Sequence, residues 1–160
     1  MSERYRKGAH AVHDVKYHFV WKTKYSYAVL KREVALRTRQ IIREICEARG
    51  LMIVSGNVRA NHVHLLVSCP TDLASSKVVL YLKGKSSFRL QREFRELQKR
   101  YWGQHLWARG YFCATVGAVN EEMIRQYVEN QADDEGEFRV WDLEQKTVGK
   151  ELQPDFHPEQ

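Results

Sequence analysis

Apolar and polar residues alternate near the start of the chain, from residue 11 to residue 21. The apolar side of this alternation carries Val15, Tyr17, Phe19 and Trp21. The polar side carries Asp14, Lys16 and His18. A period of two predicts a β-strand that buries one face and exposes the other.

The next segments change period twice. Residues 31–49 carry apolar side chains at helical spacing, and Gly50 supplies a helix stop. Residues 51–54 form a short apolar strand, and alternation resumes over 58–68 before Pro70. Between them, Gly56-Asn57 is a turn signal, so the two strands are predicted to form a hairpin.

A long amphipathic segment follows, over residues 73–97, with Thr71-Asp72 as its expected cap. Gly84 lies inside this predicted helix, where glycine costs about 1 kcal/mol relative to alanine and favours a kink. Residues 106–116 are predicted to form a strand, interrupted by a turn at Arg109-Gly110. A last helix is predicted to begin at Asn120 and to run through Gln131.

The predicted order is strand, helix, strand, strand, helix, strand, helix. It favours an α+β fold of the ferredoxin-like or RRM-like kind, with a mainly antiparallel sheet and helices on one side. The C-terminal helix would carry Tyr127. Many functions occur on such folds, so the function has to be argued from the site.

Length and composition indicate one domain. A chain of 160 residues supports a single sizeable core, predicted over residues 1–132, and residues 133–160 are interpreted as an acidic appendage that is partly disordered. Neither a membrane span nor a signal peptide is predicted. Three widely spaced cysteines give no disulfide framework, so a cytoplasmic protein that acts at the nucleoid of a bacterium or archaeon is expected.

Charge is distributed unevenly along the chain. Residues 1–110 contain 22 Lys and Arg against 8 Asp and Glu, whereas residues 111–160 contain 4 against 12. A strongly basic body favours a polyanionic partner such as nucleic acid, because Lys and Arg displace counterions from phosphates. A well-solvated basic surface explains the charge equally well.

Two histidines form the first candidate site. His62 and His64 are two residues apart on a predicted strand, so both rings point to one face, while Val63 and Leu65 face the core. Two imidazoles this close can bind one divalent metal. Taken alone, the pair is more often two ordinary histidines on a solvent-facing sheet.

The second candidate site lies on the last predicted helix. Tyr127 and Gln131 are four residues apart and therefore share one face. A phenol can act as a nucleophile where a metal or base assists its ionisation, and a glutamine carbonyl suits Mg²⁺ or Mn²⁺. Taken alone, Tyr127 is better explained as a packed aromatic residue.

A third candidate surface is the basic face of the helix predicted over residues 73–97. Its members recur at helical spacing and would contact DNA phosphates, with a tyrosine available for base stacking. They are Lys77, Tyr81, Lys83, Lys85, Arg89 and Arg92. A solvated face with an incidental tyrosine deserves nearly equal weight.

Four segments in register resemble one family. Residues 61–67, Asn-His-Val-His-Leu-Leu-Val, resemble the HUH motif (His, bulky hydrophobic residue, His) of TnpA-type single-tyrosine transposases from the smallest bacterial insertion sequences. Residues 10–21, 81–87 and 106–117 agree with that family in content and order. The resemblance covers residues 10–131.

The resemblance implies a mechanism. His62, His64 and Gln131 would bind a divalent metal, Mg²⁺ or Mn²⁺, and Tyr127 would attack single-stranded DNA to leave a 5′-phosphotyrosine and a free 3′-OH. It also implies recognition of DNA hairpins and a homodimer, in which the tyrosine helix can complete the partner's site. Asp commonly precedes the first histidine in this family, whereas this chain has Asn61.

Two other functions remain open at this point. One is a non-enzymatic RRM-like module that binds nucleic acid through its sheet. The other is a domesticated nuclease of the same family that acts on repeated extragenic palindromes.

Overall fold

A computed structural model describes residues 5–117 and 121–123 and contains a four-stranded sheet, in which every neighbouring pair of strands is antiparallel. The strands are β3 (Val15–Lys22), β4 (Met52–Arg59), β5 (His62–Cys69) and β6 (Phe112–Val116). Their order across the sheet is β4-β5-β3-β6. This arrangement is the ferredoxin-like plan that the element order predicts, so the predicted fold class is confirmed.

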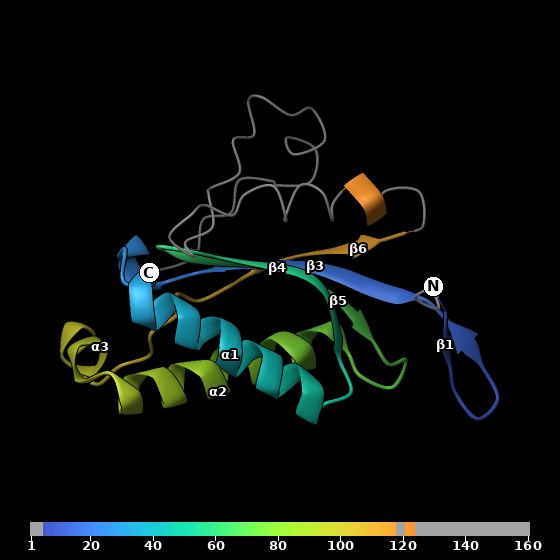
Figure 1. Ribbon diagram of the computed structural model, residues 1–160, viewed down its shortest axis with the longest axis horizontal. Helices are drawn as coiled ribbons and strands as arrows, with labels where there is room; N and C mark the ends of the chain where they lie inside the picture. Colours follow the sequence, from blue (N-terminus) through green and yellow to red (C-terminus); the bar gives the residue numbers. More distant parts are fainter. Residues whose placement is uncertain (1–4, 118–120, 124–160) are drawn as a thin grey trace.

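The helices pack against one face of the sheet (Figure 1). They are α1 (Arg32–Ala48), α2 (Ser75–Glu93) and the short α3 (Arg95–Arg100). A 3₁₀ turn, η1 (Lys24–Ser26), follows β3. Two short strands, β1 (Arg6–Lys7) and β2 (Val12–His13), pair as a separate ribbon; the sequence did not predict β1, and β2 lies within the strand predicted over residues 11–21.

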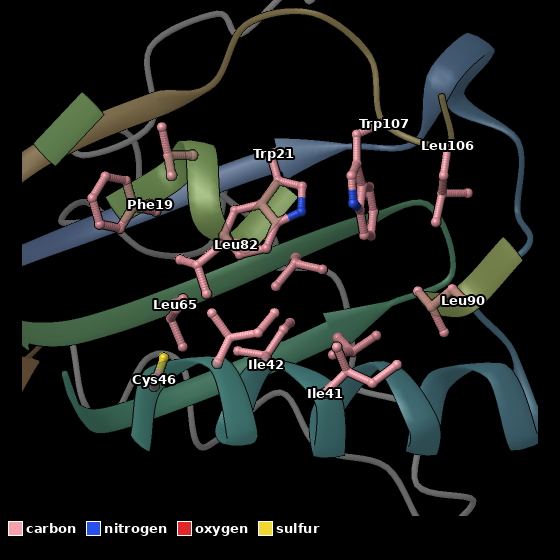
Figure 2. Packing of buried hydrophobic residues seen from close by; sticks show 14 of the residues in the cluster. Phe19, Trp21, Ile41, Ile42, Cys46, Leu65, Leu82, Leu90, Leu106 and Trp107 are labelled. Carbon is pink, nitrogen blue, oxygen red and sulfur yellow. The ribbon is translucent and has the colours of Figure 1, made fainter. Parts of the chain in front are cut away.

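The core fills the space between the sheet and these helices (Figure 2). Phe19 and Trp21 of β3 are fully buried there, as are Ile41 of α1 and Leu82 of α2. The ring of Trp107 meets that of Trp21 edge to face, with centroids 6.0 Å apart. The apolar faces predicted for β3, α1 and α2 therefore meet in one core.

The prediction of a turn at Gly56-Asn57 is wrong. β4 continues through both residues, because Gly56 pairs with Leu65 and Asn57 pairs with His64. A Cβ atom on Gly56 would lie 3.3 Å from Cδ1 of Leu65, so glycine here permits a close approach between strands. The hairpin reverses instead at residues 60–61, directly before His62.

The predicted start and kink of the second helix are also wrong. The N-cap is Ala74, without a side-chain hydrogen bond, rather than Thr71-Asp72. The helix continues through Gly84 and breaks at Phe94, whose φ of −119° and ψ of 101° are extended. One glycine in a packed helix costs too little to break it.

The strand predictions at 11–21 and 106–116 need correction as well. β3 is buried on both faces, because Lys16 and His18 are 6% and 0% exposed. Only Phe112–Val116 pairs as a strand, while Trp107 makes an isolated bridge to Thr23. The turn at Arg109-Gly110 is consistent with the positive φ of Gly110, 78°.

Among the described residues, no helix is long and apolar enough to cross a membrane.

Candidate active site on the histidine-bearing face

His62 and His64 lie on β5, one of the two inner strands of the sheet, and their side chains are on the face opposite the helices. Their ring centroids are 4.9 Å apart, and the two rings are tilted by 69°. The side chains are 8% and 3% exposed. The two imidazoles are therefore adjacent, as expected from their spacing, but are buried rather than exposed on a wet face.

Asn61 fixes the orientation of the first histidine. Its Oδ1 lies 2.6 Å from Nδ1 of His62. A carbonyl oxygen only accepts hydrogen bonds, so Nδ1 carries the proton and the lone pair that can bind a metal lies on Nε2. The residue that departs from the common Asp of the family thus still provides an oxygen acceptor for this ring.

His18 is a third histidine of this site, and sequence reasoning assigned it no role. It lies on β3, and its Nε2 is 3.3 Å from Nδ1 of His64. The two rings are nearly parallel, with centroids 5.6 Å apart and planes 18° apart. His18 was placed on the polar side of its strand, but the register that brings it beside His64 cannot be read from local alternation.

Burial keeps the three histidines neutral. It lowers the pKa of His18 to about 4. It also lowers the pKa of His62 to about 4, with a further contribution from the positive charges of Lys22 and Arg59. The pKa of His64 is well below its usual value, first through burial and then through the other two histidines. Neutral imidazole is the form that binds metals, so the donors fit a divalent ion.

The described residues do not by themselves form a metal site. Over residues 5–117 and 121–123, no group of three or more His, Cys, Asp or Glu gathers as a complete set of ligands. Tyr127 and Gln131 lie outside the described residues, as does the acidic segment 133–160. Glu121 is in contact with the histidine-bearing face, since its Oε2 lies 3.4 Å from Nζ of Lys16 on β3.

The predicted basic face of α2 lies on the other side of the sheet from the histidines (Figure 1). Several of its members already have partners in the protein. The guanidinium of Arg49 lies 3.9 Å above the Tyr81 ring, and Nη2 of Arg89 is 2.6 Å from Oε2 of Glu44. Lys77, Lys85 and Arg92 are exposed. α2 therefore has exposed cations, whereas one face of the Tyr81 ring is already in contact with Arg49.

Lys83 makes two hydrogen bonds within the protein. Its Nζ donates hydrogen bonds to the carbonyl oxygens of Ala108, at 2.8 Å, and Gly110, at 2.9 Å. Three residues further along the same segment, Ser86 Oγ accepts a hydrogen bond from the Trp107 indole at 2.8 Å. Residues 81–87 thus hold the connection that leads into β6. The two segments 81–87 and 106–117 are therefore in contact in the structure.

The comparisons with known proteins agree on one family. The sequence model described as "Transposase IS200 like" matches residues 11–131. The ISDra2 transposase TnpA of Deinococcus radiodurans is 35% identical over 130 residues, which cover 81% of this chain and 93% of that protein. The transposase for insertion sequence element IS200 of Salmonella typhimurium is 33% identical over 127 residues, covering 79% and 83%.

Solved structures agree as well. A candidate transposase from Deinococcus radiodurans R1 matches with a TM-score of 0.66 and 36% identity, covering 79% of this chain and 97% of that one. A REP-associated tyrosine transposase bound to a REP hairpin shares the fold, with a TM-score of 0.58, 15% identity and coverage of 99% and 93%. Family match, sequence identity and fold together lead to one conclusion: this chain belongs to the IS200-like transposase family.

Proposed function

We propose that this transposase cleaves and rejoins single-stranded DNA at the ends of an insertion sequence, with Tyr127 as nucleophile. The main support is the buried pair His62 and His64, held neutral and in contact on the histidine-bearing face. Glu121, which precedes Tyr127 in the sequence, contacts Lys16 on that same face. Residues 1–132 are taken as the nuclease domain and 133–160 as an appendage, in line with a family match that ends at Gln131.

The proposed reaction keeps the number of phosphate ester bonds constant. The Tyr127 phenolate oxygen attacks the phosphorus, the bond from phosphorus to the 3′ oxygen breaks, and the departing oxygen takes up a proton as a free 3′-OH. A 3′-OH from another DNA end then attacks the phosphotyrosine, which releases Tyr127 and joins the two strands. No external energy source is needed, because one ester replaces another at each step.

His62, His64 and Gln131 are the proposed ligands of a divalent metal, Mg²⁺ or Mn²⁺. When bound, such an ion supplies Lewis-acid stabilisation of charge on the scissile phosphate. The protein's own contribution is to hold two imidazoles with fixed protonation, through Asn61 for His62 and through His18 for His64. A carbonyl donor from Gln131 suits a hard cation of this kind.

A hairpin substrate is proposed by analogy. The REP-associated tyrosine transposase with this fold is bound to a REP hairpin, and the basic body of this chain suits DNA. A non-enzymatic RRM-like module is disfavoured, since it requires exposed aromatic residues where β3 and β5 carry buried histidines.

One experiment tests the nuclease directly. The protein is incubated with Mg²⁺ and end-labelled single-stranded DNA that carries a hairpin, and the products are separated on a denaturing gel. We expect a covalent protein–DNA band that is absent for Tyr127→Phe and in excess EDTA. His64→Ala should abolish this band while hairpin binding persists. A complete lack of covalent product across candidate end sequences would contradict the proposal.

Mixed proteins test the proposed homodimer. Tyr127→Phe retains the histidines, and His64→Ala retains the tyrosine. If each tyrosine acts in the partner's site, mixing the two inactive variants should restore covalent product through hybrid dimers. If each site is built from one chain, the mixture should stay inactive.

A further inference from the structure

Two cations flank His62 on the histidine-bearing face. In the antiparallel register, Lys22 of β3 pairs with His62 from one side, and Arg59 of β4 pairs with it from the other. Directly paired residues on neighbouring strands share a face of the sheet. The side chains of Lys22 and Arg59 therefore lie on either side of a proposed metal ligand, where DNA phosphates would approach.

The loop that follows Lys22 is fixed to the turn before His62. The backbone N–H of Thr23 donates to the Asn61 carbonyl at 2.9 Å, and that of Leu30 donates to the Ala60 carbonyl at 2.9 Å. On another side, the N–H of Lys24 donates to the carbonyl of Leu106 at 2.8 Å. Residues 23–30 are thus held beside the site by the turn at residues 60–61 and by Leu106.

Lys24 of this loop and Arg100 of α3 each lie beside one of the loop's aromatic rings. Nζ of Lys24 lies 5.4 Å from the centroid of the Tyr25 ring, and the Tyr25 and Tyr27 centroids are 5.4 Å apart. The guanidinium of Arg100 lies 4.2 Å from the centroid of Tyr27. Alternating cations and rings are the arrangement that proteins use to bind single-stranded nucleic acid, with rings for bases and cations for phosphates.

Tyr25 is held in an unusual conformation. The φ of Tyr25 is 62° and that of Ser26 is 55°. Both values lie in the left-handed region, which residues other than glycine rarely adopt. The side chain of Tyr25 is nevertheless 47% exposed, so burial in the core does not explain the conformation. Backbone strain of this kind tends to persist at binding sites and active sites.

We propose that Lys22, Lys24, Tyr25 and Arg59 form a track for single-stranded DNA that leads to His62. A base stacks on the Tyr25 ring, and the three cations contact the phosphates on its path toward the histidines. The track selects single strands, because bases in a duplex have no free face to stack on a protein ring. The assignment rests on the proposed nuclease function and adds the surface that guides its substrate.

The test measures equilibrium binding without cleavage. A fluorescently labelled single-stranded oligonucleotide of about 15 nucleotides, without a hairpin, is titrated with the full chain in EDTA, and anisotropy is recorded. Tyr25→Ala should weaken the Kd at least about fivefold, the lower end of what one base–ring stack contributes. Tyr25→Phe keeps the ring and should bind like the wild type.

Two further variants sharpen the result. Lys24→Gln should weaken binding and reduce the slope of log affinity against log salt by about 0.7, the value for one contact with a single-strand phosphate. Phe88→Ala is the matched control, because Phe88 is also an exposed ring, 61% accessible, beside a cation, Arg92, but on α2. It should bind like the wild type.

Wild-type affinity in both Tyr25→Ala and Lys24→Gln would overturn the track, as would an equal loss in Phe88→Ala. The nuclease proposal has a separate readout, the covalent product of Tyr127 in Mg²⁺. Covalent product together with wild-type affinity in both Tyr25→Ala and Lys24→Gln would refute only the track. Weakened Tyr25→Ala binding without covalent product from the wild type would support the track and refute the nuclease.

Discussion

Nε2 of His18 and Nδ1 of His64 lie 3.3 Å apart between neighbouring inner strands, with the two rings nearly parallel. Two neutral imidazoles can share only one proton along this line. When Nδ1 of His64 carries it, His18 is the acceptor and the lone pair of His64 is on Nε2. In that arrangement Nε2 of His64 is the nitrogen that would bind the proposed metal, and His18 would be a positioning residue.

The first prediction concerns this pair. His18→Phe keeps a ring of similar size but removes the acceptor, so Mn²⁺ affinity should fall roughly 10- to 100-fold. His18→Gln, which offers an amide oxygen, should recover part of the loss. Calorimetric titration with Mn²⁺ measures the effect, and a thermal melt checks that each variant is folded. Unchanged affinity in folded His18→Phe would show that the pair does not orient His64.

The second prediction concerns the acceptor for His62. Asn61→Ala removes the oxygen that lies 2.6 Å from Nδ1, so metal affinity should fall by a factor in the same range. Asn61→Asp replaces the amide with a carboxylate of the same shape and should bind Mn²⁺ at least as tightly as the wild type. Similar behaviour of the two variants in the titration would contradict this role for Asn61.

The third prediction compares Lys83, which is hydrogen-bonded within the protein, with Lys85, which is exposed on α2. Lys83→Met removes two hydrogen bonds and leaves the carbonyls of Ala108 and Gly110 without this donor, so the free energy of unfolding should fall by about 1–3 kcal/mol. Lys85→Met, at an exposed position nearby, should stay within about 0.5 kcal/mol of the wild type. Urea denaturation measures both. Equal stabilities would mean that Lys83 does not hold the 106–111 connection.

The fourth prediction concerns thiol reactivity. Burial raises the pKa of Cys46 to about 12 and that of Cys69 to about 11. A raised pKa keeps the proton on the thiol at pH 8, and the thiolate is the reactive form, so both residues should resist iodoacetamide in the folded protein. Mass spectrometry should find Cys46 and Cys69 labelled only after denaturation. Rapid labelling of Cys46 at pH 8 would contradict the packing of α1.

The raised thiol pKa values also set a pH dependence of stability. The unfolded thiols lose their protons near pH 8.5, whereas the folded thiols keep them. Above that pH the folded state therefore binds more protons than the unfolded state, and the free energy of unfolding should fall as pH rises toward 11 to 12. Cys46→Ala should make this decline shallower in denaturation curves between pH 8 and 10.

Periodicity was sufficient for the element types and the fold class. The alternation that includes Phe19 and Trp21, and the helical spacing that includes Ile41, each place a residue correctly in the core. Local turn signals were less reliable. Gly56 was interpreted as a turn, yet it lies within β4, because cross-strand pairing with Leu65 outweighs the preference of a single residue.

The sequence predicted only those parts of the site whose residues are close together along the chain. Two positions that are two residues apart on one strand share a face, so the adjacency of His62 and His64 followed from the sequence. His18 did not, because it lies 46 residues from His64 and meets it only through the register of β3 and β5. The loop around Tyr25 was missed for a similar reason: its contacts are to Arg100 and to the turn before His62, both distant in sequence.

The placement of the histidines on the two inner strands has a kinetic consequence. β3 and β5 are hydrogen-bonded on both sides, to each other and to β6 and β4. Amide hydrogens in such strands exchange with solvent mainly when the whole domain opens, whereas those of edge strands and loops exchange through local fraying. The amides flanking His18 and His64 should therefore be among the slowest to exchange, so the site keeps its geometry between catalytic cycles, whether or not an ion is bound.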